Sequence, residues 1–223
     1  MKPINKPRIK ICCINSMEEA QLAISIGASA IGLVSEMPSG PGVITEFKIK
    51  EIAEAVPPPI ATFLLTSKTD ADEIVAQQKR LGTNTIQIVD KLISGTHKEI
   101  KESLPGISIV QVIHVLNDES IDEALKVSEN VDAILLDSGN PNLEVKELGG
   151  TGRKHNWEIS RKIREAVDIP VFLAGGLNYT NVREAIDTVS PFALDVCSGV
   201  RTNGNLDAVK LKMFFDEVNK TKY

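Results

Sequence analysis

An acid, a thiol and several glycine turns are the parts of this sequence that could do chemistry. Asp137 ends the apolar run AILLD, and Cys12 ends the apolar part of KICCIN. A carboxylic acid beside a thiol makes an acid–base pair, in which one group removes a proton from carbon and the other protonates a leaving oxygen. Each residue also has a structural interpretation, Cys12 as a small buried hydrophobe and Asp137 as a turn residue before Ser-Gly-Asn-Pro. The strand-end position of Asp137 favours a catalytic role for the acid.

Three glycine turns are candidate phosphate sites. They occupy residues 149–152, 174–177 and 198–200, and the last two follow apolar runs directly. Glycine permits positive φ and close backbone approach, so that successive amides can converge on an anion near a helix N-terminus. Ordinary tight turns are the alternative for each one taken alone.

The histidines and cysteines show no pattern of a metal site. The three histidines do not form a ligand set, and the three cysteines lack the paired spacing of a zinc site or a disulfide framework. We expect reduced thiols and no metal. Among the histidines, His114, near a predicted strand end, is the candidate pocket member, and a packing or hydrogen-bonding role is the more common alternative for such a histidine. Cys13 is expected to point away from Cys12, towards the helices, because successive strand residues face opposite sides.

Short β-branched runs alternate with amphipathic segments along the whole chain, which indicates parallel βαβ construction. Strands are predicted at residues 9–14, 30–35, 60–65, 85–89, 108–115, 133–137, 170–173 and 192–197. Helices are predicted at residues 17–26, 46–56, 71–81, 98–103, 121–128, 157–167, 181–189 and 206–219. Eight such pairs in 223 residues predict the α/β class and a single (β/α)8 TIM barrel domain spanning residues 1–223. An open doubly wound sheet is the alternative architecture.

A barrel would gather residues that are far apart in the chain. The carboxyl ends of all its strands meet at one rim, where the active sites of such barrels lie. Cys12, Ser35, Asp137, Gly175 and Ser198 are therefore predicted to face this rim and to form one candidate pocket. Phosphate often binds between the loops after strands seven and eight, and two of the glycine turns occur there. The pattern predicts isomerase chemistry on a substrate that carries a phosphate group.

Composition excludes several other classes of protein. Hydrophobic residues make up 42% and charged residues 25%, with a net charge of −5 and no basic stripe interleaved with aromatics, so we expect no nucleic acid partner. The segment MKPINKPRIK has no apolar signal region, and no run approaches the ~20 apolar residues of a membrane span. We expect a cytoplasmic protein with no membrane partner.

Five motifs in order, KICCIN, DAILLDS, GGTGRKHNW, VFLAGGLNYTNV and LDVCSGVR, resemble the N-(5'-phosphoribosyl)anthranilate isomerase family of tryptophan biosynthesis. The resemblance implies a cofactor-free Amadori rearrangement in an eightfold barrel, by a monomer or homodimer acting on a small phosphorylated sugar. It implies that Cys12 is the general base at C2' and that Asp137 is the general acid at the ring oxygen. The substrate phosphate would bind around Gly150, Thr151, Gly152, Gly175, Gly176, Ser198 and Gly199.

Departures from the family motifs concern the aromatic end of the substrate. The family commonly has Ser-Pro-Arg after its second strand, where this chain has residues 40–42, Gly-Pro-Gly, and Cys13 replaces a common glycine. Arginine binds a carboxylate bidentately and glycine cannot. Arg153 and Lys154 are the candidate substitutes. Three hypotheses stay open: a phosphoribosylanthranilate isomerase with an altered carboxylate clamp, a related phosphosugar isomerase with a different aglycone, and a non-catalytic phospholigand-binding relative.

Overall fold

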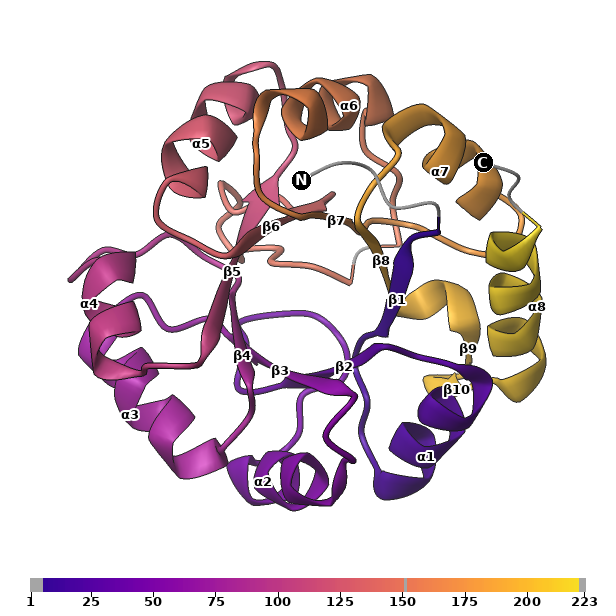
Figure 1. Cartoon of the computed structure of the whole chain (residues 1–223), viewed down its shortest axis with the longest axis horizontal. Helices are drawn as coiled ribbons and strands as arrows, with labels where there is room; N and C mark the ends of the chain where they lie inside the picture. Colours follow the sequence, from indigo (N-terminus) through magenta and orange to yellow (C-terminus); the bar gives the residue numbers. More distant parts are fainter. Residues whose placement is uncertain (1–5, 151, 221–223) are drawn as a thin grey trace.

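The protein is a closed parallel barrel ringed by helices, in a computed structural model that describes residues 6–150 and 152–220 (Figure 1). Neighbouring strands follow sequence order, and β8 closes the barrel against β1. The strands are β1 Arg8–Ile11, β2 Ala30–Val34, β3 Ala61–Thr66, β4 Thr85–Ile88, β5 Ser108–His114, β6 Ala133–Asp137, β7 Val171–Leu173 and β8 Ala193–Val196. This confirms the predicted (β/α)8 TIM barrel and excludes the open doubly wound sheet.

The helices alternate with the strands and form the outer layer (Figure 1). They are α1 Met17–Ile26, α2 Glu46–Ala55, α3 Ala71–Leu81, α4 His97–Ser103, α5 Glu119–Ser128, α6 Trp157–Ala166, α7 Val182–Val189 and α8 Ala208–Asn219. A short 3-10 helix, η1 (Ser198–Val200), and the hairpin β9 (Arg201–Thr202) and β10 (Asn205–Leu206) lie between β8 and α8.

Local sequence signals set most of these boundaries. Ser16 caps α1 by accepting a hydrogen bond from the Glu19 amide at 3.2 Å, and Gly27 ends the helix with φ 114°. The largest difference from prediction is at β1, which ends at Ile11 rather than Ile14. Cys13 has φ 62°, a left-handed conformation that no strand contains, so the chain turns away there.

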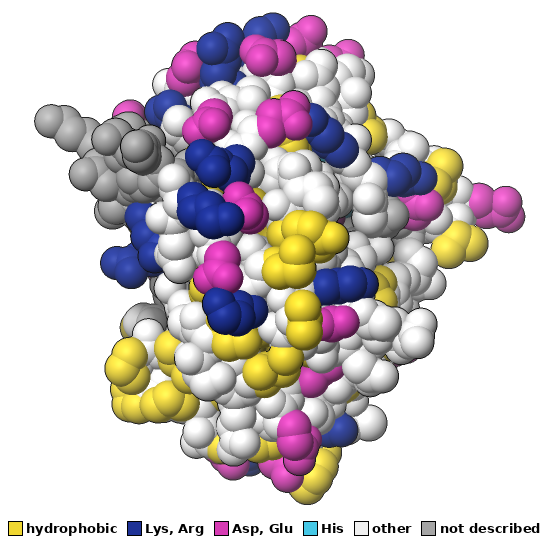
Figure 2. Space-filling model, turned by 90° about the vertical axis from the view of Figure 1, so that its right-hand side faces the viewer, with side chains coloured by type: hydrophobic (Ala, Val, Ile, Leu, Met, Phe, Trp, Pro, Cys, Tyr) yellow, Lys and Arg dark blue, Asp and Glu magenta, His cyan; other side chains and the backbone are white. Residues whose placement is uncertain are grey.

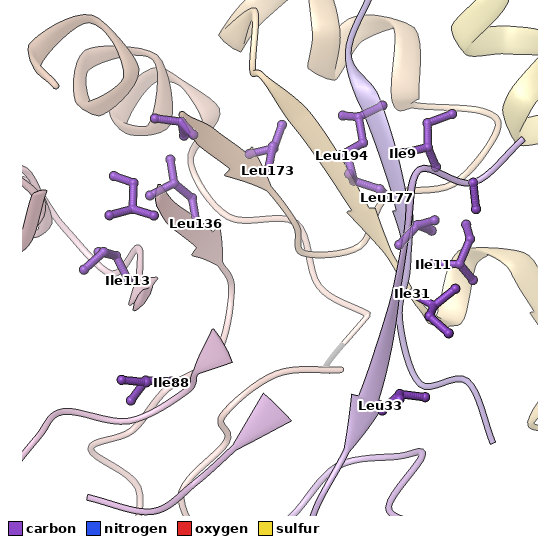
Figure 3. Packing of buried hydrophobic residues seen from close by; sticks show 14 of the residues in the cluster. Ile9, Ile11, Ile31, Leu33, Ile88, Ile113, Leu136, Leu173, Leu177 and Leu194 are labelled. Atoms are coloured by element: carbon purple, nitrogen blue, oxygen red, sulfur yellow. The ribbon is translucent and has the colours of Figure 1, made fainter. Parts of the chain in front are cut away.

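Two apolar layers hold the barrel together. Ile9 and Ile11 of β1 pack outward against the helices, among the aliphatic side chains drawn in Figure 3. Cys12 faces the barrel interior, where Phe63 and Phe172 meet edge to face at 5.8 Å between ring centroids. Full burial of one such aliphatic side chain contributes about 1.5–3 kcal/mol. Strand alternation therefore separates the residues that build the shell from those that can reach the pocket.

Charges of both signs are interspersed on the face shown in Figure 2. In the part of the chain that the structure describes, no helix is long and apolar enough to cross a membrane. Within those same residues, no group of three or more His, Cys, Asp or Glu side chains could hold a metal ion.

Candidate active site

A pocket opens at the carboxyl ends of the strands, and it contains both members of the predicted acid–base pair. Cys12 follows β1, Asp137 ends β6 and Asp195 lies on β8, and all three line this pocket. The barrel thus brings together side chains that are more than a hundred positions apart in sequence.

The Cys12 thiol lies over a glycine that leaves room for it. Cys12 is 7% exposed, and a β carbon added at Gly32 on β2 would lie 3.0 Å from its Sγ and 3.1 Å from the Nζ of Lys10. Contacts under 3.4 Å are rare for a real β carbon. Gly32 therefore allows the thiol and the ammonium group to lie close together at the floor of the pocket.

Asp137 is a buried carboxyl group that lies close to Ser138 and Gly149. Its Oδ1 accepts a hydrogen bond from the Ser138 amide at 2.7 Å, and a β carbon at Gly149 would lie 2.9 Å from its Oδ2. Burial raises the pKa of Asp137, and this outweighs the Ser138 amide and the charge of His114, which lower it. A carboxyl group with a raised pKa keeps its proton to higher pH, as a general acid requires.

Beneath the pocket, Lys10 and Asp195 form an ion pair at 2.9 Å. Lys10 is completely buried, and burial by itself opposes its charge. Attraction to Asp195 and to Cys12 outweighs that effect and raises the pKa of Lys10. Sequence reasoning missed this pair, although a lysine inside the apolar run RIKICC and an aspartate inside ALDVC were signals of it.

Arg201, on β9, fixes the turn that follows β1. Its guanidinium donates to Glu19 at 2.8 Å and to the carbonyl of Cys13 at 2.6 Å. Burial opposes the charge of Glu19, but the Arg201 guanidinium outweighs it and holds the pKa of that carboxyl below its usual value. This buried clamp, which sequence reasoning also missed, holds the backbone immediately after Cys12.

The expectation that Cys13 faces the helices is wrong. Cys13 lines the pocket, and its Sγ lies 2.7 Å from the Sγ of Cys197. The left-handed φ of 62° breaks the strand alternation on which the expectation depended. Cys197, at the end of β8, lines the pocket as well.

The three glycine turns pack directly on one another. A β carbon at Gly176 would lie 2.7 Å from the backbone carbon of Arg153, and one at Gly199 would lie within 3 Å of the Leu177 carbonyl. Gly152 and Gly176 have φ 69° and 64°. The turns therefore need glycine for both conformation and space, which brings their backbones close enough to form one anion cradle.

Most of the expected phosphate ligands line the pocket. Those in its wall are Gly150, Gly152, Gly175, Gly176 and Ser198. Gly199 lies in η1 beside Ser198 but outside the lining. Thr151 lies outside the described residues.

The expected carboxylate-binding cations point elsewhere. Arg153 pairs with Glu147, and Lys154 pairs with Glu184 at 2.9 Å. The Nζ of Lys154 also lies 3.5 Å from the ring centroid of Trp157. Neither cation is among the residues that line the pocket.

The histidines support the site from outside it. The Nε2 of His114 donates a hydrogen bond to the Val89 carbonyl at 3.0 Å, and His114 is not among the residues that line the pocket. His155 Nε2 is 2.7 Å from the Ser160 hydroxyl. Burial lowers the pKa of His155 to about 4, so its ring is neutral at neutral pH. A β carbon at Gly175 would lie 2.9 Å from His155 Nδ1, which places this ring directly behind the glycine turn at residues 174–177.

Comparison with known proteins identifies the family of this barrel. Residues 9–217 match the model of the family described as N-(5'phosphoribosyl)anthranilate (PRA) isomerase. The chain belongs to the PRA isomerase family. A relative from Methanocella arvoryzae, named N-(5'-phosphoribosyl)anthranilate isomerase, is 33% identical over 216 residues, covering 96% of this chain and 99% of its own. A Methanosarcina mazei relative, N-(5'-phosphoribosyl)anthranilate isomerase 2, is 37% identical over 93% of this chain and 92% of its own.

Solved structures of PRA isomerases share the fold. The enzyme from Thermotoga maritima superposes with a TM-score of 0.80 at 29% identity, covering 96% of this chain and 100% of its own. A structure of a PRA isomerase in complex with reduced 1-(o-carboxyphenylamino)-1-deoxyribulose 5-phosphate gives a TM-score of 0.77 at 27% identity with the same coverage. The family resemblance stated from the motifs is thereby confirmed over nearly the whole chain.

Proposed function

We propose that this protein catalyses the PRA isomerase reaction, the Amadori rearrangement of an N-(5'-phosphoribosyl) arylamine to a 1-arylamino-1-deoxyribulose 5-phosphate, without a cofactor. One observation carries the proposal: a buried thiol and a buried carboxyl group share a pocket whose wall includes the glycine cradle. The names of the relatives indicate anthranilate as an aglycone of the reaction.

The first step belongs to Asp137. Its proton is donated to the ring oxygen of the ribose, the bond from that oxygen to C1' breaks, and the nitrogen lone pair forms a protonated Schiff base at C1'. The raised pKa of Asp137 keeps this proton available. Burial also protects the carboxyl group from competing water.

The second step belongs to Cys12. Its thiolate removes the proton from C2', and the electrons of that bond move to C1' and nitrogen to give an enolamine. Ketonisation then moves a proton from the C2' hydroxyl oxygen to C1', so that no atom is gained or lost overall. Lys10 lies beside the thiol and supplies a compensating positive charge at this point.

The glycine cradle gives the reaction its position. Backbone amides around Gly152, Gly176 and Ser198 would bind the substrate phosphate and hold the sugar between the thiol and the acid. Glycine at positions 176 and 199 permits the close packing of the turns described above. Binding energy at the unreactive phosphate is thereby used to align the reacting carbons.

The experiment follows the loss of anthranilate-type fluorescence when purified protein receives phosphoribosylanthranilate. We expect turnover by the unmutated chain and a loss of about 10²–10⁴-fold in kcat for Cys12→Ser and for Asp137→Asn. Both variants should still bind the reduced product analogue, because the cradle is intact. Absence of turnover in the unmutated protein would refute the proposal, and retained analogue binding would then favour a non-catalytic phospholigand-binding role.

A further inference from the structure

Within residues 6–150 and 152–220, no cationic side chain lines the pocket. Among the described residues that form its wall, the charged side chains are Asp137 and Asp195, and no lysine or arginine is present. Lys10, below the floor, is already paired with Asp195. A carboxylate on the substrate would therefore enter a pocket without a free counter-charge.

The side of the pocket across from the cradle is apolar. Val34 ends β2, Leu65 lies on β3 and Val89 follows β4, whereas the cradle follows β7 and β8. In a closed barrel of this strand order, β3 lies opposite β7. Met37 and Leu148, from the two long loops, complete the apolar wall. With the phosphate in the cradle and the sugar at the acid–base pair, the aglycone falls on this side.

One unpartnered polar atom faces this apolar side. The Oε1 of Gln87, on β4, is buried and has no hydrogen-bond partner within residues 6–150 and 152–220, and Gln87 lines the pocket. A buried acceptor without a donor costs about 1–3 kcal/mol, which a ligand donor would recover. The arylamine N–H of the substrate is such a donor. A carboxylate has no proton to donate.

Position 42, in the loop after β2, cannot carry a side chain because Cys13 occupies the space. A β carbon at Gly42 would lie 2.4 Å from the β carbon of Cys13, and one at Gly150 would lie 2.5 Å from Pro41. The two departures from the family motifs, Cys13 for glycine and Gly42 for arginine, are therefore sterically coupled. The Cys13 side chain, its α carbon at 2.9 Å and the φ of 81° at Gly42 together exclude a side chain at position 42.

We propose that this pocket selects N-(5'-phosphoribosyl) arylamines through apolar contact with the ring and a hydrogen bond from the aryl nitrogen, so that an uncharged aglycone binds at least as tightly as anthranilate. The proposal rests on the function proposed above. Its physical basis is the penalty of several kcal/mol, in order of magnitude, for burying a carboxylate without a partner.

The test compares two reduced product analogues by titration calorimetry, one carrying the o-carboxyphenyl group and one carrying an unsubstituted phenyl group. We expect the Kd of the carboxyphenyl analogue to be equal to or larger than that of the phenyl analogue. A carboxyphenyl analogue that binds more than ten-fold tighter, or failure of both analogues to bind, would overturn the inference.

Turnover of phosphoribosylanthranilate and phosphoribosylaniline separates this inference from the proposed reaction. If both analogues bind but neither substrate is turned over, the proposed reaction is refuted. The ratio of the two Kd values then decides the selectivity. Turnover of both with a kcat/KM more than ten-fold higher for the anthranilate would refute the selectivity but support the reaction. We expect similar kcat/KM values for the two substrates.

A double variant tests the steric explanation. Cys13→Gly/Gly42→Arg should bind the carboxyphenyl analogue more than ten-fold tighter than the phenyl analogue, since the 2.4 Å and 3.1 Å contacts with the Cys13 side chain are removed and a cation is added. The φ of 81° at position 42 and the 2.9 Å approach to the α carbon of residue 13 remain, so circular dichroism first establishes that the double variant is folded. Cys13→Gly alone is the matched control and should keep the ratio of the unmutated chain. Glycine suits the left-handed backbone at position 13, so folding should survive. An unchanged ratio in the double variant would overturn the explanation.

Discussion

Lys10 and Asp195 form an ion pair at 2.9 Å beneath the pocket, although 185 positions separate them in the sequence. The pair lies inside the barrel, where Lys10 on β1 is in register with Asp195 on the neighbouring β8, two residue positions before Cys12. Because Lys10 is fully buried, its charge depends on this partner.

Removing Lys10 should destabilise the fold strongly. Lys10→Met leaves the Asp195 carboxylate buried and unpaired, and we expect the free energy of unfolding in urea to fall by about 3–5 kcal/mol. Lys212→Met is the matched control, because Lys212 pairs with Asp216 at a similar distance, 2.8 Å, but on the exposed side of α8. The control should lose no more than about 1 kcal/mol. Equal losses in the two variants would contradict the importance of burial.

The pH dependence of kcat should report Asp137 as an acid. Because burial raises its pKa, the protonated form persists to higher pH than in an exposed aspartate, and kcat should fall as pH rises through that pKa. The charge of His114 lowers the pKa of Asp137, so His114→Gln should move this falling limb to higher pH. A pH–rate profile of the two proteins measures the shift. A shift to lower pH would show that the assignment is incorrect.

A β carbon at Gly176 should disrupt the phosphate cradle. Gly176→Ala places that carbon 2.7 Å from the Arg153 backbone, and we expect inorganic phosphate to bind more than ten-fold more weakly. Gly204→Ala is the control, because Gly204 also has positive φ, 81°, but nothing lies within 4 Å of its added carbon. It should lose only about 1–2 kcal/mol of stability from backbone strain and no phosphate affinity. Equal phosphate affinity in the two variants would argue against the cradle.

Stability should fall in mild acid because of His155. Its pKa is about 4 in the folded protein, below the ordinary 6.5, since burial opposes its charge. As pH falls, the unfolded chain therefore binds the proton before the folded protein does. The contribution of His155 to the free energy of unfolding is fully present above pH 6.5. It declines as pH falls towards 4, by up to about 1.4 kcal/mol per pH unit. Chemical denaturation at pH 7 and pH 5 measures this decline. His155→Gln keeps a polar group beside Ser160 without titrating, so a decline of the same size in that variant would exclude His155 as the cause.

The sequence by itself determined the repeated strand and helix pattern and, through it, the barrel and the rim positions of Cys12 and Asp137. These follow from periodicity and capping, which depend on residues only a few positions apart. Each glycine turn was visible for the same reason.

Only the tertiary structure decided which groups meet between the strands. Three features depend on distances between segments that are far apart in the sequence. They are the pairing of Lys10 with Asp195, the close approach of Cys13 to Gly42, and the position of Arg153 outside the pocket wall. The left-handed φ of Cys13 reversed a side chain that strand alternation had placed among the helices. Ion pairing and steric exclusion act through space at a few ångströms, and no local pattern in the chain encodes which distant segments come that close.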